Sequence, residues 1–264
     1  WPYSYKVFNF LRQEKIDLVH AHQPFGIGLN ALLFARREKI PIVYSFHTLF
    51  TRYLHNIPLI PQRLIKPLVS CYLRWFCQQT DTIVVPSTMV RRLLSFWGVK
   101  KPIAVIPSGI DLQLINEKRS GPYREQIRQQ LKLPATANIL FSSSRVSAEK
   151  NIPFLLQAFA QIRQQAPETY LVIAGGGPQL EEYRQRQEER VIFVGHIPPE
   201  QLIEYYFAAD IFIYASVTET QGLVIAEAKA CGLPVVAVFG GGVADAIHSG
   251  RDGFLVPPQL AEFI

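Results

Sequence analysis

Short runs of apolar residues alternate along the chain with longer segments in which apolar positions recur at helical spacing. The short runs predict buried strands, and the longer segments predict amphipathic helices. In the first part of the chain, helices are expected at Tyr3–Glu14, after Gly26 and Gly28 through Arg37, and from an N-cap at Ser87 to Trp97, with strands at Asp17–Ala21, Ile42–Phe46, Thr82–Pro86 and Ile103–Ile106. Strands joined by helices predict a parallel, doubly wound sheet that binds ligands at the carboxyl ends of its strands.

A polar stretch separates this part from a second one with the same alternation. Residues 116–122 have the composition of a linker, and a new apolar strand begins at Asn138. We therefore expect an α/β protein of two domains, residues 1–111 and 112–264, with the boundary near Asp111. In the second domain, helices are expected at Ile152–Gln164, Leu180–Arg190 and Glu200–Ala208, and strands at Tyr170–Ala174, Val191–Val194, Ile211–Tyr214 and Val235–Val238.

Composition places the chain among globular proteins and narrows its partners. Of 264 residues, 48% are hydrophobic and 18% are charged, which is enough to bury substantial cores. The formal charge of +6 favours an anionic partner, and a nucleotide, an acidic lipid surface and nucleic acid all fit. We disfavour nucleic acid, because the aromatic residues do not line an evident basic strand face.

Cysteine content and hydropathy bear on the compartment. The three cysteines form neither a CxxC pair nor an even set, so reduced thiols in the cytoplasm are the expectation. No apolar run approaches the roughly 18 residues of a membrane-spanning helix, and no basic start precedes an apolar segment. We expect a cytoplasmic protein that is neither secreted nor transmembrane. The first residue, Trp1, is not an initiator Met, which indicates that the natural start is missing.

The stretch Ser216–Ala237 contains the first candidate site. Glu219 lies just before a helix predicted to start at Gly222, and Glu227 lies inside that helix. Free amides at the helix start, at Gly222 and Leu223, would bind an anion such as phosphate, whereas the two carboxylates would accept hydrogen bonds from neutral hydroxyls. The segment therefore fits a ligand with both a diphosphate and sugar hydroxyls. An ordinary amphipathic helix with two solvated carboxylates is the alternative.

Arg145 and Lys150 form a second candidate site, in a Ser-rich turn that follows a strand and opens a helix. If this turn faces the helix start at Gly222, both side chains would stabilise a departing diphosphate; if it does not, they are solvated surface cations. The chain has no Asp-x-Asp pair to hold a metal on a diphosphate. We therefore predict that the reaction is metal-independent and needs no cofactor.

Histidines mark the ends of two strands in the first domain. His47 follows the strand Ile42–Phe46, at a carboxyl end where this fold class places functional groups. His20 and His22 share one strand face. Two histidines are too few for a metal site without a third ligand, so we interpret this pair as cleft lining or structure.

The segment between Pro61 and Thr80 mixes basic, aromatic and branched apolar residues. This mixture suits an anionic membrane surface, where rings lie at the level of the headgroups and cations meet acidic lipid. The alternative is a helix packed on its own sheet, with Pro67 interrupting the pattern. The sequence leaves both open.

Four motifs occur in an order that resembles one enzyme family. VIPSGID, RVSAEKN, VIAGGGP and TETQGLVIAEA follow one another along the chain, and together they resemble the family 4 retaining glycosyltransferases of the GT-B fold. The resemblance implies two facing Rossmann-like domains. The Gly-rich opening strand of the first domain and the last helix of the second are missing, so we expect the chain to be truncated at both ends.

The resemblance also implies a role for each candidate residue. His47 and Glu219 would act on the donor sugar, His47 near the reacting carbon and Glu219 through the hexose hydroxyls. Glu227 would bind the ribose of the nucleotide. The diphosphate would be bound by the side chains and helix-start amides of Arg145, Lys150, Gly222 and Leu223. The leaving phosphate would serve as the base for the acceptor hydroxyl.

Within the family, SFHTLFTRYLHNIPLI and TETQGLV most resemble bacterial diacylglycerol glucosyltransferases. This implies transfer of glucose from UDP-glucose to a lipid such as diacylglycerol, with peripheral attachment to the inner membrane face. Other hexosyltransferases, such as mannosyltransferases with a polyprenyl, inositol-lipid or sugar acceptor, are enzyme alternatives. A nucleotide-sugar epimerase and a non-catalytic sugar-nucleotide-binding fragment are alternatives of another class.

Overall fold

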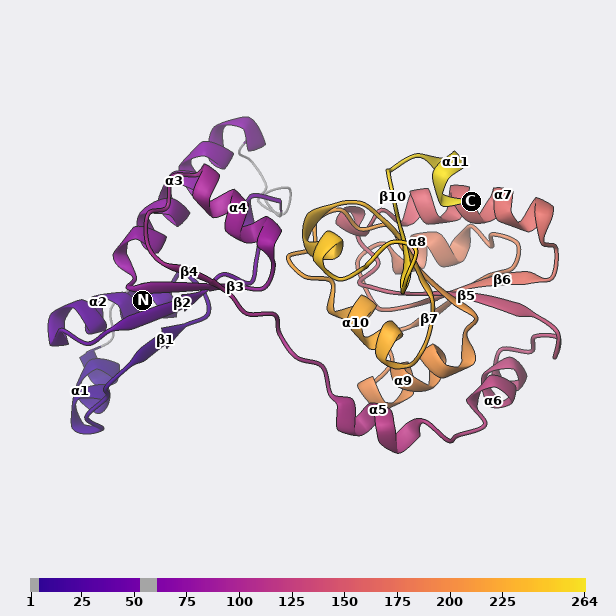
Figure 1. The fold of residues 1–264 in the computed structure, drawn as a ribbon, viewed down its shortest axis with the longest axis horizontal. Helices are drawn as coiled ribbons and strands as arrows, with labels where there is room; N and C mark the ends of the chain where they lie inside the picture. Colours follow the sequence, from indigo (N-terminus) through magenta and orange to yellow (C-terminus); the bar gives the residue numbers. More distant parts are fainter. Residues whose placement is uncertain (1–4, 53–60) are drawn as a thin grey trace. The chain divides into compact units, whose positions relative to one another are not determined.

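The computed structural model describes residues 5–52 and 61–264. The chain divides into two compact units, residues 1–107 (unit 1) and 108–264 (unit 2). In Figure 1 the colours follow the sequence, from indigo at the start of unit 1 to yellow at the end of unit 2. The predicted helix start at Tyr3 and residues 53–60 of the segment SFHTLFTRYLHNIPLI lie outside the described residues.

Unit 1 contains, within the described residues, a four-stranded parallel sheet in the order β1-β2-β3-β4. Its strands are β1 (Val19–Ala21), β2 (Ile42–Ser45), β3 (Thr82–Val85) and β4 (Ile103–Val105), and its helices are α1 (Tyr5–Gln13), α2 (Ile27–Glu38), η1 (Phe50–Arg52), α3 (Gln62–Gln79) and α4 (Thr88–Phe96). The Ser87 side chain accepts a hydrogen bond from the Val90 amide at 3.3 Å, so the predicted N-cap of α4 is confirmed. Apolar side chains of β2, β3, α3 and α4 form one buried core.

Unit 2 contains, within the described residues, a six-stranded parallel sheet in the order β10-β9-β8-β5-β6-β7. The strands are β5 (Asn138–Ser143), β6 (Thr169–Ala174), β7 (Val191–Gly195), β8 (Ile211–Tyr214), β9 (Val235–Val238) and β10 (Gly253–Val256). The helices are α5 (Leu112–Lys118), α6 (Tyr123–Gln130), η3 (Ala148–Lys150), α7 (Ile152–Gln165), α8 (Leu180–Gln185), α9 (Pro199–Ala208), α10 (Leu223–Ala230), η4 (Gly241–Asp245) and α11 (Leu260–Phe263).

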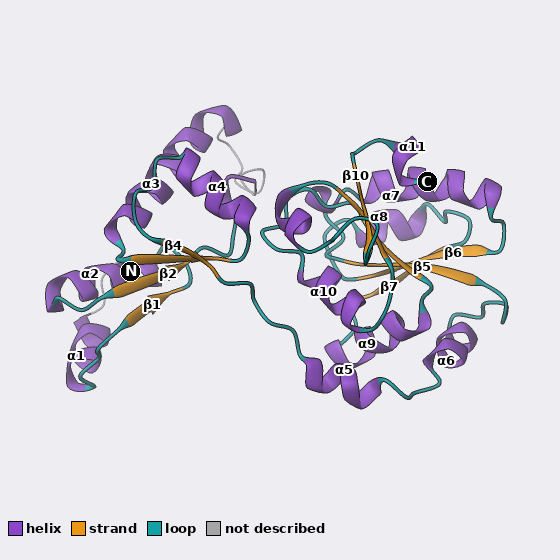
Figure 2. Cartoon of the chain, in the orientation of Figure 1, coloured by secondary structure: helices purple, strands orange, loops and turns teal. Residues whose placement is uncertain are grey.

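Helices cover both faces of the unit 2 sheet, as Figure 2 shows. Alternate residues of β5 belong to different cores: Phe141 packs with α5, α6, α9 and α10, whereas Leu140 packs with α7, α8 and α11. A strand whose two faces are both buried reads as a continuous apolar run, which is why the sequence pattern located these strands. The strand order places β5 and β8 side by side in the middle of the sheet, and because they are parallel their carboxyl ends lie at the same edge.

Two predicted elements differ in the structure. The expected linker, residues 116–122, is short and lies between two helices: α5 includes its first three residues and ends at Lys118, and α6 begins at Tyr123. Ile115 and Ile127 are buried, and Lys118 forms a 2.6 Å ion pair with Glu204. The helix predicted at Leu180–Arg190 ends at Gln185. Gln187 and Arg190 adopt positive φ angles of 47° and 62°, which an α-helix cannot contain.

Candidate functional site

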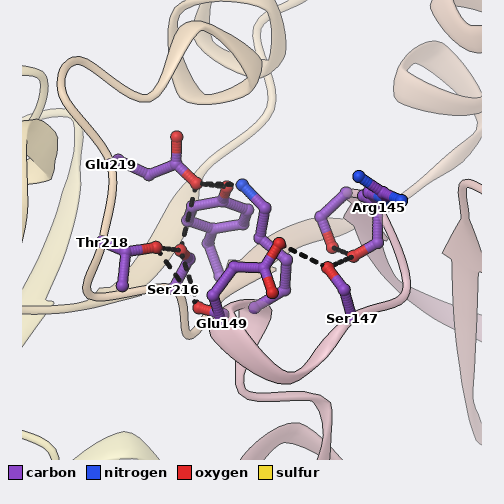
Figure 3. Close-up of polar contacts among 9 residues, drawn as sticks. Arg145, Ser147, Glu149, Ser216, Thr218 and Glu219 are labelled. Atoms are coloured by element: carbon purple, nitrogen blue, oxygen red, sulfur yellow. Dashed lines mark hydrogen bonds and ion pairs between the residues drawn. The ribbon is translucent and has the colours of Figure 1, made fainter. Parts of the chain in front are cut away.

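The loop between β8 and α10 places Glu219 among several hydrogen-bond donors. Its Oε1 atom accepts from Lys150 Nζ at 2.5 Å, Tyr214 Oη at 2.6 Å and Ser216 Oγ at 3.0 Å (Figure 3). The side chains of Lys150 and Glu219 are 14% and 18% exposed, so this ion pair lies mostly out of water. Lys150 was predicted to bind a diphosphate and Glu219 to bind hydroxyls, and the structure brings both side chains into one cluster.

Lys150 reaches this loop from the turn that follows β5. Asn151, with a φ of 56°, ends this turn and begins α7. The Glu149 carbonyl accepts hydrogen bonds from Ser216 Oγ and Thr218 Oγ1, both at 3.4 Å. Because β5 and β8 are neighbouring strands, the two turns that follow them meet at the carboxyl edge of the sheet, where this fold class binds ligands.

The surroundings of Glu219 keep its carboxyl group ionised. Burial is the largest influence and by itself raises the pKa. The positive charge of Lys150 and the hydrogen bonds from Lys150, Tyr214 and Ser216 together outweigh burial, so the pKa is below its ordinary value. Glu219 is therefore an anionic acceptor for hydrogen bonds at neutral pH.

Arg145 lies at the start of the same turn as Lys150, but its side chain is exposed. Figure 3 shows its guanidinium group well apart from Glu219. The Arg145 carbonyl accepts from Ser147 Oγ at 3.5 Å, and Ser147 Oγ also donates to a Glu149 carboxylate oxygen at 2.7 Å. The structure brings Lys150, and not the Arg145 side chain, to Glu219.

The start of α10 is shifted by one residue from the prediction. Gly222 is the N-cap with a φ of 80°, in the left-handed region that favours glycine, and the helix begins at Leu223. Hydrogen bonding begins with the Ile225 amide, which donates to the Gly222 carbonyl at 3.0 Å. The amides of Leu223 and Val224 precede this bond at the positive end of the helix dipole, a position suited to an anion.

The second carboxylate of the motif, Glu227, lies within α10 and is also held by a tyrosine. Tyr206 Oη of α9 donates to Glu227 Oε2 at 2.9 Å. The pKa of Tyr206 lies well above its ordinary value, first because the ring is buried and then because of the Glu227 charge, so its hydroxyl stays a donor.

Neither tyrosine, Tyr206 nor Tyr214, was predicted as a site residue. Each lies in an apolar run, where it is read as a core aromatic residue. Their hydroxyl groups were the available signal, because a buried tyrosine usually needs a hydrogen-bond partner.

Two glycine runs support the turns of the site. An added Cβ on Gly242 would lie 2.0 Å from the Thr220 carbonyl oxygen, and one on Gly241 would lie 2.3 Å from the Glu219 carbonyl oxygen. The Gly242 amide also donates to the Glu219 carbonyl at 2.7 Å. An added Cβ on Gly175 would lie 1.8 Å from the carbonyl oxygen of Ser144. The glycines therefore permit close backbone packing under the two turns.

In unit 1, the structure brings a third histidine to the predicted pair. His22 Nδ1 and His47 Nε2 are hydrogen-bonded at 3.1 Å, and the His20 and His22 ring centroids are 4.2 Å apart. His20 Nε2 also bonds Ser45 Oγ at 2.8 Å. Among residues 5–52 and 61–264, no group of three His, Cys, Asp or Glu side chains is arranged to hold a metal ion. The three imidazoles thus form a cluster at the carboxyl ends of β1 and β2, in which His22 is hydrogen-bonded to His47 and in ring contact with His20.

Partial burial lowers the pKa of His20 and of His47 below the ordinary histidine value. The neighbouring imidazoles lower both further, because two protonated rings at this separation repel. His47 is therefore a neutral group at pH 7. The structure places it at the predicted strand end, two residues after β2.

Known proteins resemble the chain over both units. The family model for glycosyl transferases group 1 matches residues 123–264, and that for glycosyltransferase family 4 matches residues 1–114. The alpha-monoglucosyldiacylglycerol synthase of Streptococcus pneumoniae is 37% identical over 239 residues, covering 88% of this chain and 54% of the relative. The enzyme of the same name from Acholeplasma laidlawii is 26% identical over 253 residues, covering 92% of this chain and 64% of the relative.

Solved structures share the fold. The crystal structure of Anabaena Alr3699/HepE in complex with UDP superposes with a TM-score of 0.80 at 23% identity, covering 97% of this chain and 69% of that chain. The chain spans about half the length of the S. pneumoniae relative. The family matches, the two parallel α/β units and the order of the motifs agree. The chain belongs to the family 4 glycosyltransferases and has their GT-B fold.

Proposed function

We propose that the protein is a retaining glucosyltransferase that moves glucose from UDP-glucose to a lipid such as diacylglycerol. One observation carries the proposal: in a chain of this family, Lys150 and Glu219 meet at the carboxyl ends of β5 and β8, next to the first turn of α10. A cation, helix-start amides and an ionised carboxylate are the groups that a diphosphate joined to a sugar requires. The two alpha-monoglucosyldiacylglycerol synthases among the relatives support the choice of sugar and acceptor.

Each group of the site has a proposed role. Lys150, Arg145 and the amides at Gly222 and Leu223 bind the diphosphate and stabilise the charge that develops as it leaves. Glu219 binds hydroxyls of the glucose.

Two further residues complete the donor assignment. Glu227, whose carboxylate Tyr206 orients, binds the ribose. In unit 1, His47 acts on the donor sugar as a neutral imidazole, and the departing phosphate takes the proton of the acceptor hydroxyl. Side-chain cations and amides suffice for the leaving group in this scheme, so we expect activity without a divalent metal.

Helix α3 supports a lipid acceptor presented at an anionic membrane surface. One of its faces is buried: Leu73 and Phe76 are each 0% exposed. The opposite face exposes Leu64 (59%), Leu68 (69%) and Trp75 (44%), which recur at helical spacing. The same helix also exposes three basic residues, Arg63, Lys66 and Arg74. Exposed apolar residues and cations on one helix suit the headgroup region of acidic lipid.

This surface arrangement implies peripheral attachment. None of the helices among the described residues combines the length and hydrophobicity needed to cross a membrane. We propose that the protein works in the cytoplasm and reaches its acceptor by binding to the membrane face through α3.

The test is an assay of the purified protein with UDP-glucose and diacylglycerol liposomes, with and without a chelator. We expect UDP release coupled to formation of an α-glucosyl lipid, faster on anionic than on neutral liposomes and unaffected by chelation. Mannosyl or galactosyl donors, and polyprenyl or inositol-lipid acceptors, are run in parallel. Turnover only with one of these would replace the substrate assignment. An isomerised sugar nucleotide formed without acceptor would indicate an epimerase, and binding without UDP release would indicate a non-catalytic fragment.

A further inference from the structure

The hydrogen bonds of Glu219 are distributed unevenly between its two carboxylate oxygens. In the part of the chain that the structure describes, Lys150, Tyr214 and Ser216 all donate to Oε1. Figure 3 shows the other oxygen pointing away from these three donors. A carboxylate oxygen offers about two lone-pair sites, so three donors saturate Oε1. Any hydroxyl that binds Glu219 must therefore bind Oε2.

The three donors differ in how firmly they are held. Lys150 is a flexible side chain, and a bound diphosphate would compete with Glu219 for its ammonium group. Tyr214 is the last residue of β8, a strand paired on both sides, by β5 and β9. Its ring is 3% exposed and stacks on Phe212, with centroids 5.9 Å apart and planes at 19°. Tyr214 thus holds Oε1 from the rigid sheet.

We infer that Tyr214 is a positioning residue that fixes the Glu219 carboxylate so that Oε2 selects the hydroxyl pattern of the donor sugar. The inference deepens the proposed function, on which it rests for the identity of the ligand. When a donor draws Lys150 toward its diphosphate, the Tyr214 hydrogen bond keeps the carboxylate oriented. Side chains held this way on regular elements define a site more closely than side chains held by loops alone.

The test compares Tyr214→Phe with Tyr205→Phe. Both substitutions remove one hydroxyl from a buried aromatic ring of unit 2. The Tyr205 hydroxyl accepts a 3.4 Å hydrogen bond from Gln130 Nε2, and its ring stacks on Phe141, so the control loses its hydroxyl without touching either motif glutamate. Neither change leaves a cavity, so we expect both variants to keep the wild-type melting temperature within a few degrees.

The first readout needs no ligand. The Tyr214 hydrogen bond favours the ionised form of Glu219, so Tyr214→Phe should raise the Glu219 pKa, measured from the side-chain carboxyl carbon by NMR titration. The acid limb of kcat/KM should move to higher pH with it. Tyr205→Phe should leave both unchanged. An unchanged Glu219 titration in Tyr214→Phe overturns the inference.

The second readout is donor discrimination. UDP-glucose and UDP-galactose differ only in the orientation of one hydroxyl, so a mobile carboxylate should discriminate less between them. We expect Tyr214→Phe to raise KM for UDP-glucose and to reduce the glucose preference by about fivefold, the factor of roughly one net hydrogen bond. A Tyr214→Phe protein with the wild-type glucose preference, or a Tyr205→Phe protein with the same loss of preference, overturns the inference but not the proposed function. A wild-type protein that binds no UDP-glucose by calorimetry overturns the proposed function as well.

Discussion

The Glu219 cluster of unit 2 and the histidine cluster of unit 1 both lie at the carboxyl ends of parallel strands. Their surroundings favour opposite charge states, the ionised form of Glu219 and the neutral form of His47. Glu219 has an opposite charge 2.5 Å away, and its pKa is lowered to favour the charged form. His47 has another imidazole 3.1 Å away, and its pKa is lowered to favour the neutral form. Unit 2 thus offers fixed charges, and unit 1 offers an uncharged ring.

The largest expected effect comes from removing the charge that balances Glu219. Lys150→Ala takes away the diphosphate ligand and leaves a largely buried carboxylate without its counter-ion. We expect kcat/KM to fall about a hundredfold or more, and the free energy of unfolding to fall by about 1–3 kcal/mol, without loss of the folded state. Glu219→Ala should lose activity to a similar extent. Steady-state kinetics and thermal denaturation measure both effects.

Lys229→Ala is the matched control for this prediction. Lys229 also forms a 2.6 Å ion pair, with Asp252, but it lines a different cavity of about 470 Å³ with Leu233 and Phe254. We expect its kcat/KM to remain within about twofold of wild type, as for a surface substitution. In a double-mutant cycle, Lys150→Ala and Glu219→Ala should be strongly non-additive. Additive losses, or equal losses in the control, would mean that the ion pair is not part of the site.

An intermediate effect is expected from the histidine cluster, where a neutral hydrogen bond replaces the ion pair. His22→Ala removes the ring that bonds His47 and should lower kcat about five- to tenfold, more than it changes KM for the donor. The pKa of His47 should rise, because one repelling neighbour is gone, while remaining below the ordinary value because partial burial persists. NMR titration of the imidazole protons gives both values.

The pH range of the stability loss, and not its sign, separates the two clusters. The lowered pKa of His47 means that the folded state binds fewer protons than the unfolded state, so this group contributes stability above its ordinary value of 6.5 and loses it as pH falls through the lowered pKa. Glu219 behaves likewise, but starting from its ordinary value of 4.5. Acidification from pH 7 should therefore affect the histidine cluster first. A His47 that titrates above 6.5 in the wild-type protein would remove the contrast between the units.

Much of this arrangement could be predicted from sequence, because the information is local. Buried parallel strands read as apolar runs, and TETQGLVIAEA specifies a loop carboxylate, a left-handed glycine and a helix start in succession. Lys150 was recognisable for the same reason, since it closes a turn that opens α7. The helix boundaries were less accurate: Leu180–Arg190 ends early because two residues adopt positive φ, which hydrophobic spacing does not encode.

The contacts within the site depended on strand order, which is not local information. Lys150 meets Glu219 because β8 pairs with β5, although β6 and β7 lie between these two strands in the chain. Tyr214 could not be distinguished from a core aromatic residue until its hydroxyl was placed on Oε1. The stretch 116–122 resembled a linker because it contains no large apolar residue. The buried residues of the two helices, Ile115 and Ile127, lie on either side of it.

The smallest expected effect concerns Gln221, which lies in the motif loop with Glu219 but is neutral and is hydrogen-bonded to the backbone of Ser108. Its amide accepts from the Ser108 amide and donates to the Ser108 carbonyl, both at 2.9 Å. Gln221→Ala should therefore lower stability by about 1 kcal/mol and change kcat/KM less than about threefold. Gln113→Ala is the control, because it removes an exposed 2.9 Å bond to Glu117. If Gln221→Ala were as inactive as Lys150→Ala, the geometry of the loop rather than its charge would determine activity. The contrast between a charged and a neutral cluster would then have no basis.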